Sequence, residues 1–256
     1  MQVNSPATVS NYIASLRVCY RKMELDNSRF YNHKVISALN AIGSTIRHVS
    51  KGADPVSPQQ VAKILQFLLP KQNGKAMVLA IILQFMTLMR QSSIMPRNVS
   101  LFDPSRHLTV GDVKKTSDGL VIVHKWSKSE QSSHKEDIFL PSIPSSILCP
   151  VLAFDSIFSD KCNSSPSSPL IAFTNGGPMP LSYLIPYWNR AVELVKVEGQ
   201  KLTMHSLRKG GAVFLQNFTG HDGIVKTYGR WKSQAVNAYI KDRSNLLAAR
   251  AFKQNL

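Results

Sequence analysis

Apolar residues recur at helical spacing along most of the chain, and this pattern predicts a mainly helical protein. The first such segment follows Pro6, where Thr8 or Ser10 can cap a helix over residues 9–23. A second helix is expected over residues 35–49. Ser57 and Gln60 match a capping box, which predicts the start of a third helix. Further helices are expected over residues 75–89, 149–158, 181–197, 202–218 and 233–252.

Three short segments instead alternate apolar and polar residues, which is the period of a strand with one buried face. They span residues 107–113, 120–126 and 137–140. Thr116-Ser-Asp-Gly119 supplies a turn between the first two, and the polar residues 127–136 connect the second to the third. The expected fold is therefore mainly α with a small three-stranded antiparallel sheet, an α+β arrangement.

The pattern divides the chain near residue 50. Ser50-Lys-Gly-Ala-Asp-Pro-Val56 contains glycine and proline, which interrupt both neighbouring helices. The two helices expected before this linker make only a thin core, so they are expected to form part of a domain. We therefore expect a partial helical domain over residues 1–50 and a second domain over residues 51–256.

The most apolar segment, residues 76–89, predicts a buried helix. It spans about 14 residues and contains Gln84 and Thr87, which is too short a run to cross a bilayer. The N-terminus has no charged segment followed by an apolar run, so no signal peptide is expected. These features give no reason to expect a membrane partner.

The charge of the chain indicates a polyanionic partner. Its 256 residues include 31 lysines and arginines against 15 aspartates and glutamates, which gives a formal net charge of +16. Residues 196–256 hold 11 of the basic residues and only three acidic ones. An excess of this size favours nucleic acid first and an acidic membrane surface second. The simpler alternative is a basic face that keeps the protein soluble.

Cysteine, histidine and acidic residues do not form the pattern of a metal centre. Cys19, Cys149 and Cys162 lie far apart in the chain, and neither a disulfide framework nor a zinc site is expected. No acidic pair suggests a two-metal site. A sparse, odd set of cysteines fits a reducing, intracellular compartment.

Four residues near the C-terminus carry groups that suit phosphate chemistry. His205 and Arg208 are three positions apart, so on a helix they share a face and can point at one ligand atom. The planar fork of an arginine donates two hydrogen bonds to a phosphate. Trp231 follows, and the phenol of Tyr239 is a candidate nucleophile on phosphorus. Without context, the same residues also fit a surface arginine, a packed histidine and a core tyrosine.

Short sequence motifs around these residues distinguish between the two interpretations. In chain order they are Met89-Arg90-Gln-Ser-Ser-Ile-Met-Pro96, Phe102-Asp-Pro-Ser-Arg-His-Leu108, Gly111-Asp-Val113, Lys125-Trp-Ser-Lys128-Ser-Glu-Gln131, Leu148-Cys-Pro150, His205-Ser-Leu-Arg208-Lys-Gly-Gly and Gly229-Arg-Trp231-Lys-Ser233. This ordered series, over roughly residues 7–245, resembles the tyrosine recombinases, also called the phage-integrase family. Within that family it is most similar to the recombinases of DIRS/Ngaro-type retrotransposons. The resemblance implies the recombinase catalytic fold over residues 51–256, preceded by part of a helical core-binding domain that grips DNA.

The resemblance also implies a function. The chain would be a site-specific recombinase or integrase of a mobile element, acting on double-stranded DNA without a metal ion or other cofactor. Tyr239 would attack the scissile phosphate and form a 3′-phosphotyrosine, while Arg90 and Arg208 hold the non-bridging oxygens. The implied protein is nuclear, monomeric when free of DNA and homotetrameric in the synaptic complex.

Three further residues receive roles from the resemblance. His205 would accept the tyrosine proton or help to hold the phosphate. Trp231 occupies a position where the family has histidine or tryptophan, and its indole N–H can donate to a phosphate oxygen. Lys128 would protonate the leaving 5′ oxygen, and Lys125, three positions earlier, is its rival.

Two features depart from the family pattern. Ser93 stands where an acidic residue is frequent, and Trp231 precedes Tyr239 by eight residues, one fewer than in many phage relatives. Ser93 and the short N-terminal segment leave open a catalytically inactive DNA-binding remnant of a recombinase. A type IB topoisomerase-like relaxing enzyme shares the chemistry and is a further alternative.

The proposed chemistry predicts a geometry. Arg90, His205, Arg208 and Trp231 should converge on one basic concavity, with their tips within about one phosphate's reach. Tyr239 should lie at its edge, on the last or penultimate helix, and Lys128 on a hairpin loop. Gly210 and Gly211 follow Arg208 inside a helical pattern, which indicates either tight helix packing or a close approach of DNA.

Overall fold

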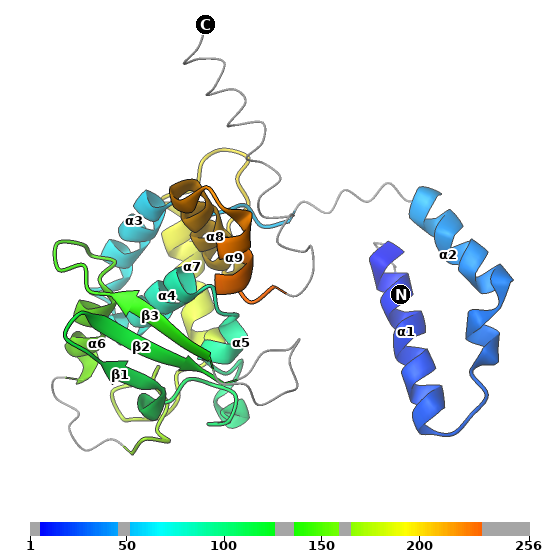
Figure 1. Cartoon of the computed structure of the whole chain (residues 1–256), viewed down its shortest axis with the longest axis horizontal. Coiled ribbons are helices and arrows are strands. Elements are labelled where there is room, and N and C mark those ends of the chain that lie inside the picture. Colours follow the sequence, from blue (N-terminus) through cyan, green and yellow to red (C-terminus); the bar gives the residue numbers. More distant parts are fainter. Residues whose placement is uncertain (1–5, 46–51, 126–135, 159–164, 232–256) are drawn as a thin grey trace, which may run out of the picture. The chain divides into compact units, whose positions relative to one another are not determined.

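A computed structural model describes residues 6–45, 52–125, 136–158 and 165–231 (Figure 1). The chain forms two compact units, residues 1–52 and residues 53–256. The boundary between them falls inside the segment that the sequence marks as a linker.

The first unit is a pair of helices, α1 (Pro6–Lys22) and α2 (His33–Thr45), connected through a short 3-10 helix, η1 (Ser28–Tyr31). Tyr20 packs edge-on against Phe30 with ring centroids 5.0 Å apart. The guanidinium of Arg17 lies over the Tyr31 ring, 4.4 Å from its centroid. Across residues 8–42, whose exposure the structure describes, no side chain is buried. The pair of helices therefore has little core of its own.

The second unit begins with α3 (Pro58–Leu68), which starts at the expected capping box. The Ser57 backbone N–H donates to Gln60 Oε1 at 3.0 Å, and the Gln60 N–H donates to Ser57 Oγ at 3.2 Å. The buried residues of α3 recur at helical spacing: Val61, Ile64, Leu65 and Leu68. Both the start and the apolar face of this helix confirm the prediction from the sequence.

Helix α4 (Gly74–Thr87) is the centre of the second unit, and all of its residues except Lys75 and Met86 are buried. Its two buried polar side chains have partners, because Gln84 Nε2 donates to the Met204 carbonyl at 2.9 Å and Thr87 Oγ1 donates to the Leu83 carbonyl at 2.6 Å. The prediction of a buried helix is confirmed, although the helix ends two residues early. None of the described helices combines the length and the hydropathy that a membrane span requires.

A three-stranded antiparallel sheet in the order β1-β2-β3 packs beside α4 and α6 (Pro150–Phe158) (Figure 1). Its strands are β1 (Val113–Lys115), β2 (Gly119–His124) and β3 (Glu136–Pro141). Leu120 pairs with Leu140 and Ile122 with Ile138, so the alternation places apolar residues on the buried face. The turn at Thr116 is confirmed by its N–H donating to the Gly119 carbonyl at 2.9 Å.

The first strand begins later than the alternation suggests, and the prediction of a strand over residues 107–112 was wrong. Thr109 and Asp112 form a capping box at a short 3-10 helix, η3 (Val110–Asp112). Asp112 Oδ2 accepts hydrogen bonds from the Thr109 backbone N–H and from Thr109 Oγ1, both at 2.7 Å. This turn takes the backbone out of the extended conformation, so pairing with β2 starts only at Val113.

The remaining helices complete the second unit. They are α5 (Gln91–Ile94), η2 (Val99–Leu101), α7 (Leu181–Glu193), α8 (His205–Thr219) and α9 (Asp222–Tyr228). The helices expected over residues 149–158, 181–197 and 202–218 are present with shifted ends, whereas α9 was not predicted. The helix expected over residues 233–252 lies outside the described residues. The fold class, mainly helical with a small three-stranded antiparallel sheet, is confirmed.

Helix α8 packs directly on α4, and glycine makes this possible. A Cβ on Gly211 would lie 2.0 Å from the Phe85 carbonyl oxygen, and one on Gly210 would lie 2.1 Å from the Val56 carbonyl oxygen. Of the two explanations for the glycine pair, close backbone packing is therefore the one that the structure supports.

Candidate functional site

Arg90 lies in the turn between α4 and α5. Helix α4 ends at Thr87, Leu88 adopts a left-handed conformation with φ 53°, and Arg90 then forms the N-cap of α5. The helix expected over residues 75–89 ends at Thr87 because this left-handed residue turns the chain. Ser93, which stands where the family often has an acidic residue, is buried, and its N–H donates to the Arg90 carbonyl at 2.9 Å.

His205 and Arg208 lie in the first turn of α8, so they share one face of the helix near its N-terminus. The partial positive charge of a helix N-terminus favours an anion there. Upstream of this turn, the Thr203 side chain accepts from the His205 N–H at 3.2 Å. The spacing seen in the sequence therefore places both groups as the hypothesis requires.

The environment of His205 connects it to both arginines. Protein atoms packed around the imidazole lower the pKa of His205 below its ordinary value of 6.5, although one side of the residue is open to solvent. The positive charges of Arg208, Arg90 and Lys209 lower this pKa further. Arg90 is therefore near enough to act on the ring, and His205 is mainly neutral at pH 7.

Arg208 is held by the segment that follows α9. It is 4% exposed, its Nη2 donates to the Gly229 carbonyl at 2.9 Å, and its Cζ lies 4.6 Å from the centroid of the Trp231 ring. The indole packs back on its own backbone, so that a Cβ on Gly229 would lie 1.7 Å from a ring atom of Trp231. Glycine is therefore required immediately before this arginine–tryptophan contact.

The structure thus brings together Arg90, His205, Arg208 and Trp231, which come from three separate segments of the chain. Lys128 and Tyr239 lie outside the described residues. Arg208 contacts Trp231, and the charges of Arg208 and Arg90 both act on His205; the single basic concavity and the catalytic roles of all six residues stay predictions.

Lys125, the rival of Lys128, has a partner inside the protein. Its ammonium group forms an ion pair with Asp112 Oδ2 and donates to the Pro104 carbonyl at 2.5 Å. The two side chains of the ion pair are only 15% and 10% exposed. Lys125 therefore links the end of β2 to η3, and the choice between Lys125 and Lys128 as the catalytic lysine stays a prediction.

Arg230 belongs to the same region, although no role for it was predicted from the sequence. Its Nη2 donates to the Thr87 carbonyl at 2.7 Å, its Nε lies 4.0 Å from Glu136 Oε2, and its side chain is 8% exposed. The only signal in the sequence was its position directly before Trp231.

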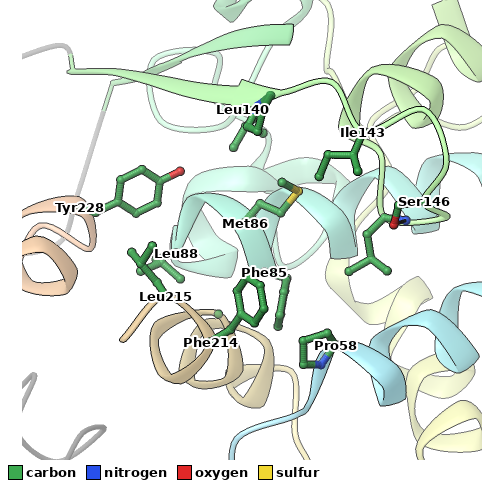
Figure 2. A pocket seen from close by; sticks show the side chains of 13 residues that line it. Pro58, Phe85, Met86, Leu88, Leu140, Ile143, Ser146, Phe214, Leu215 and Tyr228 are labelled. Atoms are coloured by element: carbon green, nitrogen blue, oxygen red, sulfur yellow. Dashed lines mark hydrogen bonds between the residues drawn. The ribbon is translucent and has the colours of Figure 1, made fainter. Parts of the chain in front are cut away.

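An apolar cavity of about 320 Å³ lies between α4, the end of β3, α8 and α9. Figure 2 shows Phe85, Leu140, Phe214 and Tyr228 among the side chains around it. No charged side chain is among the described residues that line it, so it suits apolar groups better than a phosphate. Burial raises the pKa of the Tyr228 phenol, and Arg230 opposes this rise. Tyr228 is therefore a poor candidate for a nucleophile.

Within the part of the chain that the structure describes, no group of three or more histidine, cysteine, aspartate or glutamate side chains is arranged to hold a metal ion.

Three solved recombinases share the fold. The XerH site-specific recombinase bound to its palindromic difH substrate after cleavage matches with a TM-score of 0.58 and 12% identity, over 98% of this chain and 73% of that one. The Tn1549 transposon integrase in complex with circular intermediate DNA matches with a TM-score of 0.54 and 15% identity, over 92% of this chain and 75% of that one. A lambda integrase dimer bound to a COC′ core site matches with a TM-score of 0.54 and 16% identity, over 89% of this chain and 77% of that one. The chain has the tyrosine recombinase catalytic fold.

A lambda integrase tetramer bound to a Holliday junction matches with a TM-score of 0.50 and 16% identity, over 89% of this chain but only 63% of that one. No protein-family model and no curated protein sequence matches the chain. At these identities the likeness establishes the recombinase fold, and the activity has to be argued from the residues themselves.

Proposed function

We propose that the chain is a site-specific tyrosine recombinase or integrase that cuts and rejoins double-stranded DNA, and that it integrates a mobile element of the DIRS/Ngaro type. The observation that carries the proposal is the proximity of Arg90, His205, Arg208 and Trp231 in a chain with the recombinase catalytic fold. Two guanidinium groups beside an imidazole suit a phosphodiester, whose charge increases in the transition state.

Arg90 and Arg208 would stabilise the negative charge on the non-bridging oxygens during attack. The guanidinium of Arg208 is already oriented by Gly229 and Trp231, so little reorganisation is needed at the moment of reaction. The indole N–H of Trp231 would donate to a phosphate oxygen. Loss of one such donor reduces the rate by about 10²–10³-fold in comparable sites.

Proton transfer would use His205, Tyr239 and Lys128. The Tyr239 oxygen forms a bond to phosphorus as its proton passes to His205, which can accept it because the lowered pKa keeps the imidazole neutral at pH 7. The bond from phosphorus to the 5′ oxygen breaks, and Lys128 supplies the proton to that oxygen. The products are a 3′-phosphotyrosine and a free 5′ hydroxyl. Reversal of these steps rejoins the strand without an external energy source, metal ion or cofactor.

Strand exchange would take place in a homotetramer on two DNA duplexes, with the protein monomeric when free of DNA. The tetrameric state described for lambda integrase at a Holliday junction supports this assembly. The net charge of +16 favours DNA as the partner, and the helices of residues 1–50 would contribute to the grip on it. An element that integrates into chromosomal DNA would require its recombinase to act in the nucleus.

A covalent-adduct selection tests the proposal without knowledge of the target site. Full-length protein is incubated in EDTA with nicked duplexes that carry a randomised central segment, and protein-linked DNA is recovered and sequenced. We expect an adduct whose sequences converge, and no adduct with Tyr239→Phe. Tyr228→Phe is the matched control, because Tyr228 lines the apolar cavity and should be dispensable for attack.

Other outcomes of the selection separate the alternatives. DNA binding without any adduct would identify an inactive remnant and would overturn the proposal. Relaxation of supercoiled plasmid with no recombinant product, on the selected site, would identify a topoisomerase-like enzyme. An adduct that EDTA abolishes would refute the metal-independent mechanism.

A further inference from the structure

Helix α9 ends in a Schellman motif that places an arginine where glycine is favoured. The Arg230 N–H donates to the Thr227 carbonyl and the Trp231 N–H to the Lys226 carbonyl, both at 3.0 Å. Arg230 occupies the left-handed position of the motif, with φ 56°. A side chain in this conformation costs free energy that glycine would avoid. A strained conformation persists only where other contacts of the residue offset its cost, so the contacts of the Arg230 side chain are expected to be important.

The Arg230 side chain turns back into the protein and holds the end of α4. It is 8% exposed, and its Nη2 donates to the Thr87 carbonyl at 2.7 Å. Thr87 is the last residue of α4, and its carbonyl is one of those that a helix cannot satisfy internally. A cation at this end also complements the helix dipole.

The same guanidinium faces the sheet. Its Nε lies 4.0 Å from Glu136 Oε2, at the first residue of β3. Arg230 therefore connects the segment that holds Trp231 to the end of α4 and to the start of β3.

The consequence concerns Arg90, which follows Thr87 by three residues across the left-handed Leu88. We propose that Arg230 is a positioning residue, whose guanidinium fixes the end of α4 so that Arg90 lies beside His205 and Arg208. The inference rests on the proposed function for its role in cleavage, and on the geometry alone for its effect on Arg90.

Arg230→Gly separates positioning from folding. Glycine accepts the left-handed conformation, so the Schellman motif is retained and its backbone strain is relieved. We expect this variant to unfold in a single transition like the wild type. Arg106→Gly is the matched control for loss of one positive charge, because the Arg106 side chain is 60% exposed and forms an ion pair with Asp103, three residues earlier.

The test that does not need DNA follows the pKa of His205 by NMR in the full-length protein, with the resonance assigned through His205→Asn. If Arg230 holds Arg90 beside the imidazole, Arg230→Gly should raise the pKa of His205 in the same direction as Arg90→Gln. In an Arg90→Gln background, Arg230→Gly should add nothing, because it acts through Arg90. Arg106→Gly should leave the pKa unchanged. A folded Arg230→Gly protein with a wild-type His205 pKa, or with an undiminished effect in the Arg90→Gln background, would overturn the proposal.

The second readout is the single-turnover rate of adduct formation on the selected nicked duplex. We expect Arg230→Gly to lower this rate by about 10–100-fold, the loss typical of a reacting group displaced by about 1 Å. DNA affinity should change little, and Arg230→Lys should recover part of the rate. Equal losses in rate and affinity, or a rate equal to that of Arg106→Gly, would contradict a positioning role. If wild-type protein forms no adduct, the proposed function fails. The NMR comparison of Arg230→Gly with and without Arg90→Gln still decides whether Arg230 positions Arg90.

Discussion

The guanidinium of Arg208 lies over the indole of Trp231, with Cζ 4.6 Å from the ring centroid, and both residues are buried. The bond from Arg208 to the Gly229 carbonyl fixes the same group from a second direction. The orientation of an arginine at the start of α8 is therefore set by the segment that follows α9.

Removal of the indole should disorder this arginine. A cation–π contact is worth about 0.5–2 kcal/mol, so Trp231→Ala should lower the single-turnover cleavage rate by at least about 10-fold once the lost N–H donor is included. Trp231→Phe keeps an aromatic ring under Arg208 but lacks the N–H, and it should have an intermediate rate. Quench-flow measurement on the selected duplex gives these rates. A Trp231→Ala rate equal to that of the wild type would show that the contact does not serve cleavage.

The glycine contact between α8 and α4 should be intolerant of a methyl group. Gly211→Ala places a Cβ 2.0 Å from the Phe85 carbonyl oxygen, and we expect a loss of about 1–3 kcal/mol in the free energy of unfolding. Gly223→Ala is the matched control, since a Cβ there meets nothing within 4 Å and alanine favours a helix by up to about 1 kcal/mol. Chemical denaturation of both variants compares them. Equal stability of the two would contradict the close packing.

The two lysines of the hairpin should separate into a structural and a catalytic residue. Lys125→Met leaves the Asp112 carboxylate unpaired and poorly exposed, which should cost about 3 kcal/mol of stability. Lys128→Met should leave the free energy of unfolding unchanged and reduce cleavage. A duplex with a 5′-phosphorothiolate leaving group, which needs no protonation, should restore the rate of the Lys128 variant. Rescue of the Lys125 variant instead would reverse the assignment.

The cleavage rate should depend on the protonation of His205. Burial and the charges of Arg208, Arg90 and Lys209 lower the pKa of His205 below 6.5. A base with a lowered pKa stays neutral to a lower pH, so the rate at subsaturating DNA should be constant near pH 7 and fall only as the pH drops through that pKa. His205→Asn should remove this acidic limb as well as lower the rate. An unchanged limb in that variant would assign the titration to another group.

Several parts of the fold were accessible from the sequence because their signals are local. The capping box at Ser57 and Gln60 involves residues three apart, and the apolar stripe of α3 repeats within one helix. The position of His205 and Arg208 on one face of α8 follows from helical spacing in the same way. Each of these needs only the geometry of one element.

Other features depend on contacts that no local pattern records. Helix α9 escaped prediction because it is short and buries only Val225, which leaves almost no periodicity. The ion pair between Lys125 and Asp112 and the hydrogen bond from Arg230 to the Thr87 carbonyl join residues from different elements of the chain. The prediction of a strand before Val113 was wrong because a hydrogen bond from the Thr109 N–H to the Asp112 side chain stabilises a turn there in place of extended backbone.

The packing of α8 on α4 has a consequence for the synthesis of the protein. His205 leaves the ribosome more than a hundred residues after Arg90, and translation adds roughly 5–20 residues per second. For several seconds α4 is therefore present without the helix that covers it at Phe85. The nascent chain therefore exposes the face of α4 at Phe85 in that interval, and Arg208 gains its contacts with Gly229 and Trp231 only after residue 231 has been added.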